Sequence, residues 1–114
     1  MTYSECAQYI DGILNLVDWE DTEDCSLQFN LIGADSGVFY IDIRDHVAGV
    51  RYTEDGEYNV KYVFTTPVFS RLLSKVVDPI YAYTTGKFKM MGDVPLGRRI
   101  LIKLCEQYNK AERQ

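Results

Sequence analysis

The sequence predicts an α+β domain, and two patterns carry that prediction. Between residues 25 and 65, apolar and polar residues alternate with a period of two in successive short runs, as in β-strands with one buried face. After residue 66, apolar residues recur at helical spacing in two segments, as in amphipathic helices. Because the loops between successive strands are short, we expect an antiparallel meander.

Length and composition restrict the class of protein. The chain has 114 residues, 46% of them hydrophobic, and a net charge of −5, which fit one folded domain over residues 1–114. No apolar run approaches the roughly 18 residues of a membrane span. The N-terminus shows no secretory signal and the C-terminus no peroxisomal tripeptide, so we expect a cytoplasmic protein. Cys6, Cys25 and Cys105 form no paired motif, so we expect reduced, packed thiols.

Charge is distributed unevenly along the chain. Residues 1–57 carry 13 acidic and two basic side chains, whereas residues 58–114 carry four acidic and ten basic ones. One interpretation is that the basic half meets an anionic head group or, transiently, a lipid surface. The other is that the two halves neutralise each other across the fold. The sequence leaves both open.

The first helix is expected within residues 1–17, capped by Ser4 with Glu5 in its first turn. Its apolar stripe comprises Cys6, Tyr9, Ile10, Ile13, Leu14 and Val17. Residues 18–24 hold five acidic side chains around Trp19 and are expected to form a solvated link. These acids do not follow the spacing of a calcium-binding loop, so we assign no metal there.

Four strands are expected next, at residues 26–31, 38–44, 47–53 and 58–65. Their apolar faces are predicted to consist of Leu27, Phe29, Leu31, Phe39, Ile41, Ile43, Val60, Tyr62 and Phe64. The dipeptide Asp55-Gly56 favours a tight hairpin between the third and fourth strands, because glycine accepts the positive φ that such turns need.

The remaining elements are two long helices and a fifth strand. Thr66 is the expected cap of a helix with Pro67 at its first position, and Asp78-Pro79 ends it before a short helical turn at residues 80–85. Its stripe is Val68, Phe69, Leu72, Leu73, Val76 and Val77. The fifth strand is expected at residues 87–91. Pro95 opens the last helix, whose stripe is Leu96, Ile100, Leu101, Leu104, Cys105 and Tyr108.

Motifs for catalysis are missing from the sequence. Ser36 lies one place too late in Gly33–Gly37 for a nucleophile elbow, and there is no phosphate-binding glycine loop. His46 is the only histidine and is interpreted as solvated or capping. The basic residues of the last helix lack the interleaved aromatic residues of a nucleic-acid binder. We therefore expect no enzyme, no cofactor, no metal site and no nucleic-acid partner.

The run Gly-Lys-Phe-Lys-Met-Met-Gly-Asp at residues 86–93 follows Tyr81, Tyr83 and an amphipathic helix. This arrangement resembles the sterol carrier protein type 2 domain, and the resemblance covers roughly residues 25–108. It implies a five-stranded, mainly antiparallel sheet covered on one face by helices. It also implies a tunnel between sheet and helices that holds sterols, fatty acids, acyl-CoAs or other lipids.

Energetics limit what such a tunnel can be. A dry cavity of ~300 Å³ would cost ~7 kcal/mol at roughly 24 cal/mol per Å³, which is comparable to a domain's whole net stability. We therefore expect an occupied pocket or a partly collapsed one with mobile helices. A filled core without a pocket is the alternative, because apolar stripes usually form core.

These observations lead to a hypothesis of non-enzymatic binding, and of transfer, of a fatty acid, acyl-CoA or sterol-like lipid. The residues expected to line the cavity are Phe64, Phe69, Leu72, Leu73, Val76, Ile80, Tyr83, Phe88, Met90, Leu96, Ile100 and Leu104. Arg98, Arg99 and Lys103 are candidates for contact with an anionic head group. The alternative is an interaction or accessory domain that presents an apolar substrate to a partner enzyme, as a monomer or a homodimer.

Overall fold

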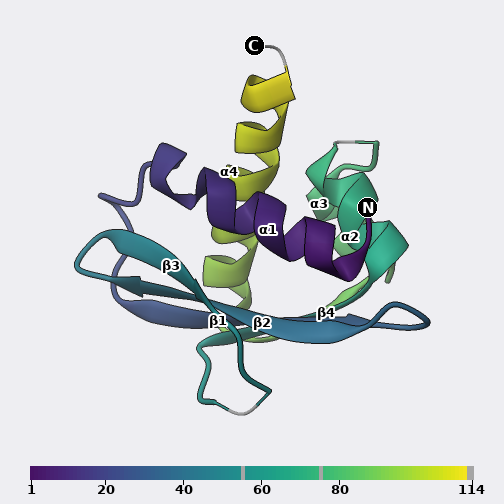
Figure 1. The fold of residues 1–114 in the computed structure, drawn as a ribbon, viewed down its shortest axis with the longest axis horizontal. Coiled ribbons are helices and arrows are strands. Elements are labelled where there is room, and N and C mark those ends of the chain that lie inside the picture. Colours follow the sequence, from purple (N-terminus) through teal and green to yellow (C-terminus); the bar gives the residue numbers. More distant parts are fainter. Residues whose placement is uncertain (55, 75, 113–114) are drawn as a thin grey trace.

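The computed structural model describes residues 1–54, 56–74 and 76–112. It forms two layers, a five-stranded sheet with the helices packed on one of its faces (Figure 1). The strand order is β3-β2-β1-β4-β5, and every neighbouring pair is antiparallel except β1 with β4. The α+β class and the mainly antiparallel sheet covered on one face are confirmed.

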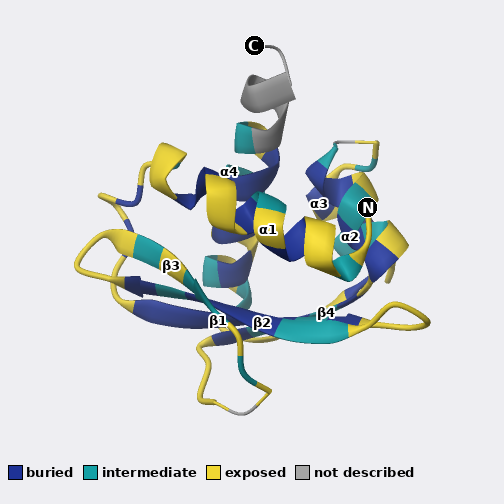
Figure 2. Ribbon diagram, in the orientation of Figure 1, coloured by how far each residue is buried: buried dark blue, intermediate teal, exposed yellow. Residues whose placement is uncertain are grey.

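The elements follow one another in the expected order. The strands are β1 Cys25–Ile32, β2 Gly37–Arg44, β3 Val47–Arg51, β4 Val60–Thr65 and β5 Lys89–Gly92. The helices are α1 Tyr3–Ile13, the 3₁₀ turn η1 Leu14–Leu16, α2 Thr66–Leu73, α3 Pro79–Thr84 and α4 Val94–Glu112. The core lies between the layers, where the helix-facing sides of β1, β2 and β4 are buried (Figure 2).

The predicted meander is wrong at one step. β4 does not pair with β3; it pairs in parallel with β1, with Phe29 opposite Tyr62. Residues 52–54 and 56–59 therefore lie on the sheet face opposite the helices, and β4 does not follow β3 in the expected hairpin at Asp55-Gly56, of which Asp55 lies outside the described residues. The Tyr40 hydroxyl donates to the Gly56 carbonyl at 3.2 Å. The parallel pairing places the buried side chains of β4, Val60, Tyr62 and Phe64, beside those of β1 at the centre of the sheet. This long-range burial outweighs the local turn signal.

The N-terminal helix begins two residues earlier than expected. Thr2, not Ser4, is its cap: the Thr2 hydroxyl accepts from the Glu5 N–H at 3.1 Å, and the Glu5 carboxylate accepts from the Thr2 N–H at 3.0 Å. This reciprocal pair is a capping box. In the predicted apolar stripe, Cys6, Ile10, Ile13 and Leu14 are buried, while Tyr9 and Val17 are half-buried.

The acidic link is only partly solvated. Trp19 is 4% exposed, and its indole N–H donates to the Leu14 carbonyl at 2.8 Å. Thr22 is also buried, and the acidic side chains on either side of these two residues are exposed. The expectation of a wholly solvated segment is thus wrong at Trp19, because a large apolar ring with a bonded indole N–H gains from burial.

The helix after β4 is shorter than expected and has a different cap. The Thr65 hydroxyl accepts from the Val68 N–H at 3.4 Å, whereas the Thr66 hydroxyl donates to the Asp35 carbonyl at 2.6 Å. α2 ends at Leu73, where the Ser74 hydroxyl donates to the Ser70 carbonyl at 3.0 Å. Residues beyond this point leave the helix, so Val76 is 72% exposed.

The last helix packs on the sheet as predicted. The Asp93 carboxylate accepts from the Leu96 N–H at 3.2 Å at its start. Ile100, Leu101, Leu104 and Cys105 are buried in its apolar stripe, with Leu96 half-buried. The side chain of Tyr108, the last predicted member, lies outside the described residues.

Candidate functional site

Aromatic rings fill the space between the sheet and the helices. We call Phe29, Phe39, Tyr62, Phe64, Phe69 and Phe88 the aromatic cluster; each is at most 4% exposed. Ring centroids are 4.5 Å apart between Phe29 and Tyr62, and 4.8 Å apart both between Phe64 and Phe69 and between Phe64 and Phe88. These rings come from β1, β2, β4, α2 and the turn before β5. They pack as a core at the place where the resemblance implies a tunnel.

The twelve residues expected to line a cavity fall into three groups. Buried in the core are Phe64, Phe69, Leu72, Leu73, Phe88, Met90, Ile100 and Leu104. Tyr83 and Leu96 are half-buried and pack against them. Val76 and Ile80 lie at the surface, 72% and 43% exposed, because α2 ends before residue 76. The structure brings most of these residues together, but against one another.

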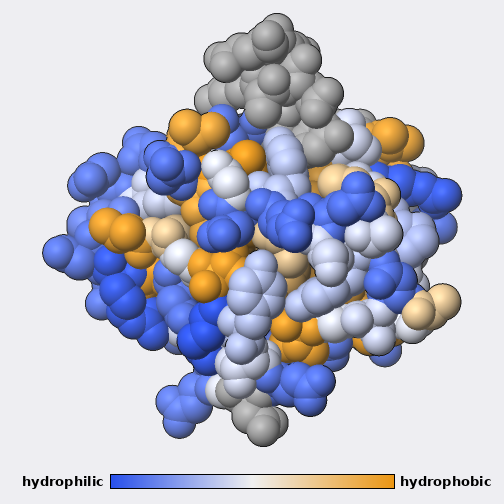
Figure 3. All heavy atoms as spheres, in the orientation of Figure 1, coloured by the Kyte–Doolittle hydropathy of each residue, from blue (hydrophilic) through white to orange (hydrophobic). Residues whose placement is uncertain are grey.

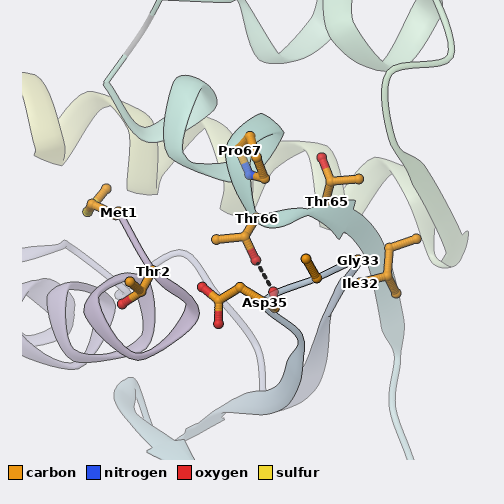
Figure 4. A pocket seen from close by; sticks show the side chains of 9 residues that line it. Met1, Thr2, Ile32, Gly33, Asp35, Thr65, Thr66 and Pro67 are labelled. Carbon is orange, nitrogen blue, oxygen red and sulfur yellow. Dashed lines mark hydrogen bonds between the residues drawn. The ribbon is translucent and has the colours of Figure 1, made fainter.

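A hollow of about 410 Å³ opens at the boundary between the two layers. It lies between the start of α1, the turn from β1 to β2 and the start of α2 (Figure 4). Its lining residues are Met1, Thr2, Ile32, Gly33, Ala34, Asp35, Thr65, Thr66 and Pro67. The hydrogen bond from Thr66 to the Asp35 carbonyl spans its floor and ties α2 to the turn.

The hollow at the layer boundary, which we call the boundary hollow, was not predicted. Its lining comes from three segments that are more than 20 residues apart in the sequence, so no local pattern marks it. The nearest signal is the exposed Ile32 beside the small residues Gly33 and Ala34, which leave room in front of an apolar side chain. The Asp35 carboxylate in this lining accepts a hydrogen bond from the Tyr3 N–H at 2.5 Å.

A second, smaller hollow lies between α2 and α3. We call it the α2–α3 groove; it encloses about 90 Å³ and is lined by Val68, Arg71, Val77, Ala82 and Lys87. Val68 and Lys87 are the chain neighbours of Phe69 and Phe88, which belong to the aromatic cluster. α2 therefore separates the two hollows and covers the cluster with Phe69, Leu72 and Leu73, each 0% exposed.

The three candidate head-group cations are placed differently from one another. The Lys103 ammonium lies 3.1 Å from the Asp21 carboxylate and donates to the Asp18 carbonyl at 3.0 Å. This contact lowers the pKa of Asp21. Arg99 lines a hollow with Asp21 and three further acidic residues, Glu23, Asp24 and Asp93. Arg98 is exposed. Lys103 is thus paired with an acidic residue of the first half of the chain, and Arg99 lies among acidic side chains.

Burial works against the reactivity of two of the three thiols, those of Cys6 and Cys25. Burial raises the pKa of Cys6 to about 11 and also raises the pKa of Cys25. All three cysteines are buried and without a disulfide. A thiol that keeps its proton near neutral pH is a poor nucleophile. In the part of the chain that the structure describes, no group of three or more His, Cys, Asp or Glu side chains is placed to hold a metal ion.

The surface carries only scattered apolar residues in the view of Figure 3, where small apolar groups are surrounded by polar ones. The exposed apolar side chains near the α2–α3 groove are Val76, Ile80 and Tyr81. A membrane-spanning helix, which must be both long and apolar, does not occur among the described residues.

Comparison with known proteins yields relatives that are much longer than this chain. No family model matches. Hydroxysteroid dehydrogenase-like protein 2 from Bos taurus is 30% identical over 83 residues, or 72% of this chain, and the Homo sapiens protein is 32% identical over 82 residues. The chain spans about a fifth of the length of these curated relatives, 20% and 19% respectively.

Solved structures show the same fold at low sequence identity. Sterol carrier protein 2-like 2 from Aedes aegypti has a TM-score of 0.72 at 16% identity, covering 87% of this chain and 93% of that one. A solution structure of the palmitated form also has a TM-score of 0.72, covering 91% and 95%. The sec-alkylsulfatase Pisa1 from Pseudomonas sp. matches with a TM-score of 0.72 over 86% of this chain but 16% of its own. The chain therefore has the sterol carrier protein 2 fold.

Proposed function

We propose that this chain, with its sterol carrier protein 2 fold, is a non-enzymatic binder of a single hydrophobic ligand such as a fatty acid, an acyl-CoA or a sterol-like lipid. The ligand lies between the sheet and the helices, and α2 moves outward to admit it. The observation that carries the proposal is the boundary hollow of about 410 Å³, which opens beside α2 at the boundary of the two layers. The palmitated structure of a protein with this fold supports it.

The energy of opening sets the class of ligand. Lifting α2 withdraws Phe69, Leu72 and Leu73 from the cluster, at roughly 1.5–3 kcal/mol each before contacts with the ligand form. A chain of about fifteen buried carbons returns roughly 12 kcal/mol at ~0.8 kcal/mol each. A chain of about seven returns only half of that and must still overcome the cost of association. Long chains are therefore expected to bind and short ones to fail.

Native mass spectrometry of protein purified from cells tests this proposal first. We expect a co-purifying lipid of one dominant mass. A fluorescent fatty acid should then be displaced at micromolar protein by palmitate but not by octanoate. If no lipid co-purifies and no fluorescent fatty acid binds, the proposal is wrong.

A second candidate function is that of an accessory domain that presents an apolar substrate to an enzyme. It is favoured by the observation that the fold occurs within longer chains, as a fifth of hydroxysteroid dehydrogenase-like protein 2 and 16% of the alkylsulfatase. Mixing the loaded protein with phosphatidylcholine vesicles separates the two. A carrier releases the fluorescent fatty acid to the vesicles, whereas an accessory domain retains it.

A further inference from the structure

The α2–α3 groove combines an apolar floor with two cations. Val68 and Val77 are half-buried there and Ala82 is fully buried, while Arg71 and Lys87 are exposed at the rim. Among the described side chains, no acidic one lines the groove. Among the side chains of residues 1–54, 56–74 and 76–107, neither Arg71 nor Lys87 has an ion-pair partner.

Asp78 is the acidic residue nearest in the sequence to the groove residue Val77, and its contacts lie outside the groove. The Asp78 carboxylate caps α3 by accepting from the Ile80 N–H at 3.3 Å. Asp78 lines a different hollow, together with Ile102 and Glu106 of α4. The charge of Arg71 and Lys87 is therefore not neutralised within the groove, in contrast to Lys103, which is paired with Asp21.

We propose that Arg71 and Lys87 hold the carboxylate of a long-chain fatty acid at the α2–α3 groove, with its alkyl chain directed inward to the aromatic cluster. This assignment rests on the proposed function, and it states where the polar end of the ligand binds. The groove's 90 Å³ equals about three water-sized volumes, which suits a carboxylate and its first methylene group. Two cations beside one carboxylate form charge-assisted hydrogen bonds, which are stronger than neutral ones.

The path from the groove inward is short. Ala82, the small residue on the floor, is the neighbour of Tyr83, whose ring centroid lies 5.7 Å from that of Phe88. The Lys87 N–H donates to the Ala82 carbonyl at 2.8 Å, which holds the lysine over this floor. A chain that passes between α2 and α3 thus meets Phe88 and Phe69 directly, and the ring centroids of both lie 4.8 Å from that of Phe64.

The test compares palmitic acid with hexadecanol, which has the same length but no charge. Both ligands are titrated against the full chain by displacement of a fluorescent fatty acid. We expect the unmodified protein to bind the acid more tightly. The double variant Arg71→Gln/Lys87→Gln is expected to lose roughly tenfold or more in affinity for the acid, as for one charge-assisted hydrogen bond, with no change for the alcohol. Each single variant should lose a smaller part of the affinity for the acid.

Controls separate the groove from general charge. Lys89→Gln removes an exposed cation outside the groove and should leave both affinities unchanged. The head-group assignment is overturned if the double variant keeps its affinity for the acid, or if it loses affinity for acid and alcohol alike. If the unmodified protein binds neither ligand, the proposed function fails with it. Far-UV circular dichroism verifies that each variant is folded.

Discussion

His46 links the turn between β2 and β3 to the acidic segment before β1. Asp45 and His46 both have positive φ, 51° and 65°, as the tight turn requires. The His46 Nδ1 lies 3.0 Å from the Trp19 carbonyl oxygen. This acceptor is the main reason that the pKa of His46 lies above its ordinary value, and the carboxylates of Glu20 and Asp45 add to it.

The raised pKa predicts a pH dependence of stability. The contribution of His46 is fully present below its unfolded pKa of 6.5 and is lost as the pH rises through the higher native value. We expect the melting temperature to fall between about pH 6 and about pH 8. His46→Asn, which tolerates positive φ, should remove this slope. An unchanged slope in the variant would contradict the assignment, because the chain has no other histidine.

The residues of a strand that face the core were easier to predict than the contacts made on the other face of the sheet. The alternation in β1 identified Leu27, Phe29 and Leu31 as core, and all three are 0% exposed. It did not indicate that Gln28, on the other face, is only 8% exposed and donates to the Tyr40 hydroxyl at 2.6 Å. Gly56 lies against Tyr40 on that face, and its position depends on the long-range pairing of β4 with β1, which a local pattern does not contain.

At the scale of elements, Gly97 lets α4 approach β4 closely. The Tyr62 hydroxyl donates to the Gly97 carbonyl at 2.5 Å. A Cβ at this position would lie 2.7 Å from a methyl carbon of Val60 and 3.1 Å from the Met90 sulfur. Gly97→Ala is expected to lower the free energy of unfolding by about 1–3 kcal/mol, as overpacking does.

Gly12 provides the matched control, since it also lies in a helix but a Cβ there would have nothing within 4 Å. Gly12→Ala should raise the free energy of unfolding by about 0.5–1 kcal/mol through helix propensity. Urea denaturation measures both changes. Equal shifts for the two variants would show that the α4–β4 contact does not need a glycine.

Replacing one side chain of α2 by a smaller one should weaken the packing of this helix on the aromatic cluster. Phe69→Leu removes volume from the cluster beneath α2 and should cost about 1 kcal/mol of stability. We expect the same change to increase the affinity for palmitate, because an apolar void favours an apolar ligand. Ile43→Val is the control, because Ile43 is equally buried on β2 but pairs with Cys25 at the far end of β1. It should lower stability without changing affinity.

The order of the elements was predictable from sequence, but two junctions were not. Periodicity indicates which residues face the core, not which strand lies alongside, so the parallel pairing of β1 with β4 remained hidden. The end of α2 at Leu73 depends on the Ser74 hydroxyl, while the apolar spacing continues to Val77. The boundary hollow follows from the first of these, because the parallel pairing of β4 with β1 places Thr65 beside Ile32.

At the scale of the whole molecule, the two charge halves partly cancel along α4. Lys103 pairs with Asp21, and Arg99 faces the acidic hollow beside Cys25. The basic charge that remains unpaired in the described chain includes Arg71 and Lys87 on the α2–α3 side. The fold thus places two free cations, Arg71 and Lys87, beside the cover of the aromatic cluster, and an acidic hollow near the start of β1.

Amide hydrogen exchange should distinguish the rigid sheet from the movable cover that α2 and α3 form. β1 is paired on both sides, by β2 and β4, so its amides are expected to exchange slowest. In residues 66–74 and 76–85 the structure shows two short helices, α2 and α3, with Val76, Ile80 and Tyr81 exposed between and on them, so their amides should exchange faster. Palmitate should slow exchange in residues 66–85 and leave α1 unchanged. If residues 66–85 exchange as slowly as β1, or if bound palmitate does not protect them, α2 and α3 do not act as the cover through which the ligand enters.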